Sequence, residues 1–138
     1  MADQVRKANY CYVKVPHRAG QGVAVVTALA EAGVNLIAYS GFPAGGGNAQ
    51  LDFVAEDVGA VRRVARRHGW RVSPTKKCFV IRGEDRLGAV QRHLDKLAKA
   101  GISVTAADAV TAGNRRYGML LWVKPRDYAR AARALGAR

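Results

Sequence analysis

Residues able to bind a small charged molecule lie in two short segments of the sequence. The first is Pro16-His17-Arg18-Ala19-Gly20, with Gly22 two residues further on, and the second is Asn35-Leu36. A glycine-containing turn at a helix start leaves backbone N–H groups free at the positive end of the helix dipole, which suits a carboxylate. The Asn35 side-chain amide can donate and accept, so it can bind carboxylate and ammonium groups, and His17 would add a donor. We therefore predict a site for a small amino-acid-like ligand.

The same residues also have ordinary structural explanations, which the sequence leaves open. Gly20 and Gly22 would serve equally well as turn glycines, and Asn35 could hydrogen-bond only the start of its own strand. His17 would then be a solvated loop residue. A pocket plugged by packed side chains would exclude the ligand-binding interpretation.

No set of residues suggests catalysis or a metal centre. The sequence has no convincing nucleophile–base pair, no paired carboxylates and no phosphate-binding loop. Cys11 and Cys78 are predicted to be reduced core thiols at equivalent positions of two strands. The three histidines, His17, His68 and His93, have no zinc-ligand spacing with these cysteines. We therefore expect a protein that is not an enzyme and that has no cofactor and no metal.

The chain consists of two similar halves. Leu29–Asn35 matches Leu97–Ser103 at an offset of 68 residues, and Leu51–Val54 matches Met119–Trp122 at the same offset. The first strands match at the two cysteines, at an offset of 67, so one residue of difference is expected in the loop that follows. A match over almost the whole chain predicts two copies of one folding unit.

Each half has the pattern of a βαββαβ unit, in which periodic apolar residues predict helices and short β-branched or aromatic runs predict strands. In the first half we expect strands at 10–15, 34–39, 49–55 and 70–72, helices at 20–32 and 58–68, and a turn-rich loop at 41–48. In the second half we expect strands at 77–82, 102–107 and 117–123 and helices at 87–100 and 126–135. Gly33 and Gly101 are expected to end the first helix of each half.

Such a unit folds as an antiparallel sheet with both helices on one face, the ferredoxin-like arrangement. The predicted fold class is α+β, with two ferredoxin-like modules in tandem, residues 8–74 and residues 75–138. The second module lacks residues for a fourth strand, because only Gly136-Ala137-Arg138 follow its last helix. Its edge would be left open, or be filled by the N-terminal segment or by another chain. An open edge strand is prone to pairing and favours a homo-oligomer.

The candidate site gives the chain a resemblance to the ACT domain, the amino-acid-sensing module of metabolic regulation. Arg18 and Gly20 match that family's x-Arg-x-Gly loop, and Gly33-Val34-Asn35-Leu36 resembles its Gly-Val-Asn-Ile start of strand two. Ala19 departs from the proline that is frequent in the family loop, which removes a preset φ angle but not the chemistry. The resemblance implies a non-catalytic regulatory protein that binds an amino acid where two modules meet.

The second half resembles the ACT pattern less closely. Asp85-Arg86-Leu87-Gly88 keeps the loop pattern, while Ser103 stands where the first half has asparagine. By this resemblance Asp85, Gly88 and Ser103 join the candidate ligand-binding residues.

The charge of the chain favours another kind of partner. The net charge is +13, from 23 Lys and Arg against 10 Asp and Glu, and it attracts nucleic acid without any specific site. Basic residues are concentrated between Arg62 and Lys77, where no acidic residue occurs. The third strand, however, lacks the aromatic platform of an RNA-recognition module and carries Asp52. Electrostatic nucleic-acid binding therefore stays an alternative to ligand sensing.

The pattern of apolar residues predicts neither a membrane span nor a signal peptide. No apolar run approaches the ~20 residues of a membrane span, and residues 1–15 lack the apolar core of a signal peptide. We therefore expect a cytoplasmic protein with no membrane association.

Overall fold

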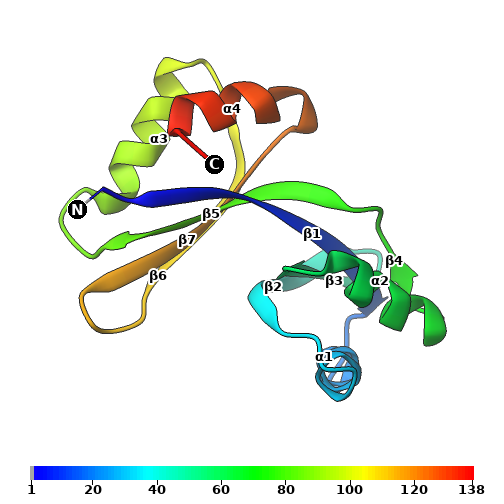
Figure 1. The fold of residues 1–138 in the computed structure, drawn as a ribbon. Helices are drawn as coiled ribbons and strands as arrows, with labels where there is room; N and C mark the ends of the chain where they lie inside the picture. The colour runs from blue at the N-terminus through cyan, green and yellow to red at the C-terminus, as the bar shows by residue number, and fades with distance from the viewer. Residues whose placement is uncertain (1) are drawn as a thin grey trace. The chain divides into compact units, whose positions relative to one another are not determined.

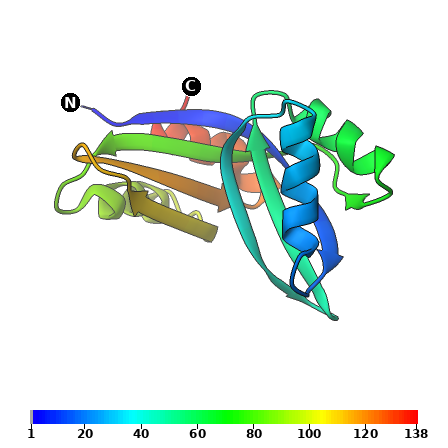
Figure 2. The same cartoon turned by 90° about the horizontal axis from the view of Figure 1, so that it is seen from below.

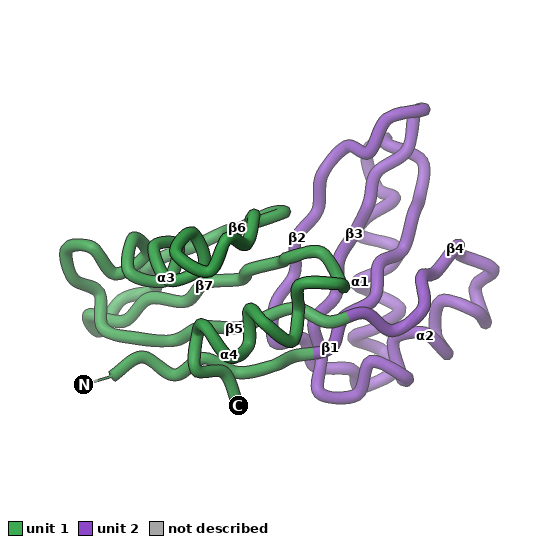
Figure 3. The backbone as a smooth tube through the Cα atoms, turned by 90° about the horizontal axis from the view of Figure 1, so that it is seen from above, with its two compact units in different colours: residues 1–8, 77–138 green, residues 9–76 purple. Residues whose placement is uncertain are grey.

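The computed structural model describes residues 2–138, and these form two compact units (Figure 3). Unit 2 consists of Asn9–Lys76, and unit 1 consists of residues 2–8 together with Lys77–Arg138. Strand β1 (Gln4–Pro16) contributes residues 4–8 to unit 1 and residues 9–16 to unit 2. The N-terminal segment therefore packs with the second half of the chain.

Unit 2 is an antiparallel sheet with two helices (Figure 1). After β1 come α1 (Gln21–Glu31), β2 (Leu36–Gly45), β3 (Asn48–Ala55), α2 (Val58–Arg67) and β4 (Arg71–Val72). The strand order is β2-β3-β1-β4, and each neighbouring pair is antiparallel. Residues from both helices and from alternating positions of β1 and β3 form one core cluster, which includes Cys11, Val13, Val25, Leu29, Leu51, Phe53, Val61 and Val64. Both helices therefore cover the same face of this sheet.

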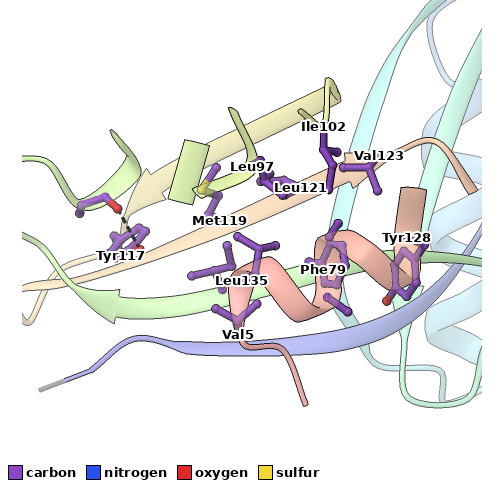
Figure 4. Packing of buried hydrophobic residues seen from close by; sticks show 14 residues of the cluster. Val5, Phe79, Leu97, Ile102, Tyr117, Met119, Leu121, Val123, Tyr128 and Leu135 are labelled. Carbon is purple, nitrogen blue, oxygen red and sulfur yellow. Dashed lines mark hydrogen bonds between the residues drawn. The ribbon is translucent and has the colours of Figure 1, made fainter. Parts of the chain in front are cut away.

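Unit 1 repeats this arrangement with its own core. Apart from Lys76, which belongs to unit 2, it contains β5 (Lys76–Glu84), and it also contains α3 (Ala89–Lys99), β6 (Val104–Thr111), β7 (Arg116–Val123), the 3-10 turn η1 (Pro125–Asp127) and α4 (Tyr128–Leu135). The strand order is β1-β5-β7-β6, and β7 is antiparallel to both β5 and β6. Figure 4 shows Phe79 of β5 packed among residues of α4, including Tyr128, whose ring stacks on it at 4.4 Å between centroids.

The first residues of β1 occupy the place of the fourth strand in unit 1. They lie beside β5, as β4 lies beside β1 in unit 2, and Figure 2 shows the blue start of the chain running along green β5. Val5 joins the unit 1 core. The Lys7 amide donates to the Arg138 carbonyl at 2.9 Å, and the Arg138 amide donates to the Val5 carbonyl at 3.1 Å. Of the alternatives left open by the sequence, the N-terminal segment is the one that fills this edge.

The strand registers correct one detail of the repeat. Cys11 lies opposite Phe53 on β3, whereas Phe79 lies opposite Leu121 on β7. Because Phe53 and Leu121 are equivalent at the offset of 68, Cys11 corresponds to Phe79 and not to Cys78. The predicted equivalence of the cysteines, and the one-residue difference in the following loop, are therefore wrong. Side chains alternate between sheet faces, so this shift by one residue takes Cys78 out of the core cluster beneath the helices. Both cysteines are buried, and neither forms a disulfide.

Strand β2 extends further than predicted. Pro43 pairs with Ala49, and Gly45 pairs with Asn48, so the loop expected over residues 41–48 is mostly a β-hairpin. Its turn is Gly46-Gly47, and both glycines have positive φ. Proline and glycine are tolerated in β2 because it lies at the end of the sheet, where outward N–H groups need no partner.

The predicted α+β class with antiparallel sheets is confirmed. The expected bounds of the helices agree with the structure within two residues, because the apolar period and the closing glycines mark both ends locally. No helix in residues 2–138 is long and apolar enough to cross a lipid bilayer.

Candidate ligand-binding site

In each unit, one glycine in the left-handed conformation precedes the first helix. Gly20 (φ 89°) caps the start of α1, and Gly88 (φ 77°) caps the start of α3. The Ala24 amide donates to the Gly20 carbonyl, and the Arg92 amide donates to the Gly88 carbonyl, both at 3.1 Å. Neither helix start has a side-chain cap. The two loops therefore share one local geometry, in which glycine avoids the steric cost of positive φ.

Backbone amides remain without an acceptor at both helix starts. Within the described chain, the amides of Gly20 and Gly22 in the first loop, and of Gly88 and Val90 in the second, donate no backbone hydrogen bond. An ideal Cβ placed at Gly20 or Gly22 would meet no heavy atom within 4 Å, so the first loop is open. Free amides at the positive end of a helix dipole favour an anion.

The residues predicted in the first loop lie together at the surface. His17, Arg18, Ala19 and Gly20 are all exposed, and the His17 amide donates to the Gly47 carbonyl at 2.8 Å. No packed side chain covers the backbone at Gly20 or Gly22, because the Cβ positions of both glycines face open space.

The second predicted motif lies away from the loop of its own unit. Asn35 and Leu36 follow α1, whose 11 residues separate them from Gly20 by about 16 Å along the helix. Ser103 follows α3 and is separated from Gly88 in the same way. The loop and the strand start therefore do not form one site within a single unit. The 3.6-residue period predicts the helix, but it does not show that the two predicted motifs lie at opposite ends of that helix.

A groove of about 850 Å³ opens in unit 1 beside the second loop. It is lined by the loop Asp85–Gly88, by one side of α3, by the end of β6 and by Tyr117. Of the predicted residues in this half, Asp85 and Gly88 line the groove, whereas Ser103 does not. This volume is within the range of small-molecule sites.

The groove combines apolar walls with charged groups at its loop end. Leu87, Leu94 and Val110 line it and are exposed, with Leu87 fully so. Asp85 and Arg86 bring one negative and one positive side chain to the same loop. An exposed apolar surface next to unpaired amides and both signs of charge suits a small molecule with an apolar part and a zwitterionic head.

Behind the groove lies a buried polar cluster that the sequence interpretation missed. The Asp3 carboxylate oxygen Oδ2 accepts from the Tyr117 hydroxyl at 2.5 Å, from Nε2 of His93 at 2.6 Å and from a guanidinium nitrogen of Arg92 at 3.0 Å. The side chains of Asp3 and His93 are 4% and 2% exposed. One signal was present: His93 falls between Ala89 and Leu97 on the buried face of α3, and a buried imidazole needs a polar partner.

The surroundings of the cluster shift the pKa values of Asp3 and Tyr117 in opposite directions. Burial raises the pKa of Asp3, but hydrogen bonds from Tyr117 and His93 and the charge of Arg92 together bring that pKa below its ordinary value. Burial, followed by the hydrogen bond to Asp3, raises the pKa of the Tyr117 hydroxyl. At neutral pH Asp3 is therefore a carboxylate that accepts from a neutral tyrosine.

Acidification is expected to loosen the N-terminal strand from unit 1. Because the pKa of Asp3 is lowered in the folded state, its carboxylate stabilises the fold above the ordinary pKa of 3.8, and this contribution is lost as the pH falls through the lowered value. Amide exchange of residues 4–8, followed across this acid range, measures the effect. The Asp3→Asn variant should lose this part of the pH dependence, and a variant that kept the full wild-type dependence would contradict the assignment.

Comparison with known proteins identifies the fold. No protein-family profile and no curated protein matches the sequence. Among solved structures, protein BT0572 from Bacteroides thetaiotaomicron matches with a TM-score of 0.81 and 16% identity, over 96% of this chain and 88% of that chain. The ligand-free regulatory subunit of aspartate kinase from Thermus thermophilus matches with a TM-score of 0.65 and 16% identity, over 98% and 93%. A structure of aspartokinase alpha and beta subunits matches with a TM-score of 0.64 and 14% identity, over 98% and 95%.

The chain thus has an α+β fold that is shared with regulatory subunits of aspartate kinase. At these identities the similarity concerns the fold, and the function has to be argued from the site itself.

Proposed function

We propose that this chain is a non-catalytic regulatory protein of the ACT type, built from two modules, that binds a small amino-acid-like molecule. The observation that carries the proposal is the set of unpaired amides at Gly88 and Val90 beside a groove with apolar walls. The shared fold with regulatory subunits of aspartate kinase supports a regulatory role. The equivalent loop from His17 to Gly22 is proposed as a second site of the same class.

In the proposed complex the ligand carboxylate accepts from the amides at the start of α3. The helix dipole and Arg86 both favour negative charge there. The ligand ammonium lies near Asp85, and its apolar part lies against Leu87 and Val110. These interactions need no bond making, and they would be stronger for a zwitterion than for an amine or an acid alone.

We also propose that the protein acts as a homo-oligomer in the cytoplasm. Strands β2 and β6 are the ends of the sheet order, and each exposes a large apolar residue, Phe42 and Val110. Burial of these edges would remove an aggregation risk. In such an oligomer, the Asn35 or Ser103 of one copy would lie near the glycine loop of another copy. Within a single unit, the length of the helix keeps these residues away from the loop.

The alternative of electrostatic nucleic-acid binding has weaker support. Arg63, Arg66 and Arg67 are exposed on α2, but Asp52 of β3 is buried and hydrogen-bonded to Gln50 at 3.0 Å. Burial raises the pKa of Asp52. Because Asp52 stands on this strand where RNA recognition on such a sheet uses an aromatic side chain, the strand lacks the stacking platform.

Thermal unfolding with the common amino acids and related metabolites tests ligand binding. A compound present at 100 times its Kd should add about 2.7 kcal/mol of stability, which raises the melting temperature by several degrees. Gly88→Ala should raise the Kd of the stabilising compound at least about tenfold, because a side chain at positive φ displaces the loop amides.

Gly101→Ala is the matched control for this experiment. Gly101 also has positive φ (71°) in unit 1 and has no atoms near its Cβ position, but it follows α3 instead of preceding it. Both variants should lose similar stability without ligand, and only Gly88→Ala should lose binding. If no compound stabilised the wild-type protein, the proposed function would be rejected.

A further inference from the structure

The buried cluster around Asp3 contains more polar groups than it pairs. In the described chain, Asp3 Oδ1, Arg92 Nε and His93 Nδ1 are buried without a hydrogen-bond partner. Such groups are costly, because each loses water without replacement. A cluster of this kind therefore calls for a role beyond the filling of a core.

The cluster joins three separate elements of unit 1. Asp3 directly precedes β1, Arg92 and His93 lie on α3, and Tyr117 lies on β7. Gly83 on β5 completes the fit, since a Cβ there would overlap the Asp3 carboxylate and approach Tyr117 Cε1 to 2.8 Å. The carboxylate is thus seated in a space that only glycine leaves free.

The same residues support the groove. Tyr117 lines it, and its hydroxyl is held by Asp3. The Arg92 amide closes the first turn of α3 on the Gly88 carbonyl, while the Arg92 guanidinium reaches Asp3. The carboxylate therefore contacts both a wall of the groove and the helix turn that presents the unpaired amides.

We propose that Asp3 is a positioning residue for the groove, and that seating of the N-terminal strand and ordering of the start of α3 are one coupled event. When the strand is seated, Asp3 Oδ2 accepts hydrogen bonds from Tyr117, His93 and Arg92 together. When the strand leaves, these three donors lose their common acceptor, and two of them, Tyr117 and His93, are buried. The wall of the groove and the start of α3 therefore relax together with the strand. A ligand that prefers the ordered groove would then hold the strand in place, and the seated strand would strengthen ligand binding equally. The ligand part of this inference rests on the proposed function, whereas the coupling itself does not.

Amide hydrogen exchange of the unliganded protein tests the coupling. In Asp3→Asn, exchange of residues 4–8 should accelerate by about 10- to 100-fold, as expected for loss of a charged acceptor at a buried site. Residues 88–93 at the start of α3 should accelerate by a similar factor. Tyr117→Phe removes one donor only and should accelerate both segments together, but by less.

Asp57→Asn is the matched control, because Asp57 is an exposed carboxylate of unit 2 and asparagine is also a good helix cap. It should leave both segments unchanged, and wild-type exchange of residues 9–76 in Asp3→Asn would show that this variant folds. Faster exchange of residues 4–8 with wild-type protection of residues 88–93 would overturn the coupling, as would no change in either segment. Failure of the metabolite screen would reject the proposed function and leave this result standing.

Discussion

Replacement of Phe79 by alanine is expected to destabilise unit 1 by about 3–5 kcal/mol. The Phe79 side chain is fully buried, and its ring stacks on Tyr128 with an angle of 7° between the planes. Its removal leaves a cavity between β5 and α4, which neighbouring side chains fill only in part. Denaturant-dependent amide exchange of the slowest amides of β7 measures the free energy of unfolding of this unit.

Phe42→Ala is the control of the same chemistry. Phe42 lies on the edge strand β2 and is 42% exposed. Its truncation should change the free energy of unfolding of unit 2 by less than about 1 kcal/mol, as is usual for surface positions. Similar losses in the two variants would show that Phe79 is not the packed centre that the structure describes.

Gly83→Ala is expected to cost unit 1 about 1–3 kcal/mol by overpacking. Gly83 has no backbone reason to be glycine, since its φ is not positive. The cost arises because the added methyl group has to displace Asp3 or Tyr117, and either movement breaks their hydrogen bond. Amide exchange should show the loss most clearly in residues 4–8.

Gly118→Ala provides the comparison on the paired strand. Gly118 lies opposite Arg82 on β5, and the nearest atom to its Cβ position is the Ile81 carbonyl oxygen at 3.9 Å, an ordinary contact. Its substitution should be neutral or slightly stabilising, because alanine loses less backbone entropy than glycine on folding. A loss at Gly118 as large as that at Gly83 would mean that steric overlap with Asp3 is not the cause.

The elements of both units could be predicted from local patterns. Helices α1 and α3 follow from apolar residues at helical spacing and from Gly33 and Gly101, which follow their ends. The extension of β2 through Pro43 could not be predicted, because proline reads as a break unless the strand is known to lie at an edge. The cysteine register failed for a similar reason: two strands of like composition can be aligned one residue apart, and only the pairing of Cys11 with Phe53 distinguishes the alignments.

The candidate site could be predicted in part. Glycines before a helix indicate free amides, and both Gly20 and Gly88 have the left-handed conformation that produces them. The groove beside Gly88 could not be seen in the sequence, because its walls come from residues on α3, β6 and β7 that are far apart in the chain. The position of Asn35 at the opposite end of α1 also emerges only when the helix is placed in space.

The order of amino acids alone predicts the helices, most of the strands, the internal repeat and the two glycine loops, because helix period, strand alternation and turn chemistry act between near neighbours. Which segment completes the sheet of unit 1 was decided only by tertiary packing. Val5 packs into the core of unit 1, and Asp3 accepts a hydrogen bond from the buried His93 of the same unit. The other residues of this unit begin at Lys77, and no local pattern in the sequence encodes a contact over that separation.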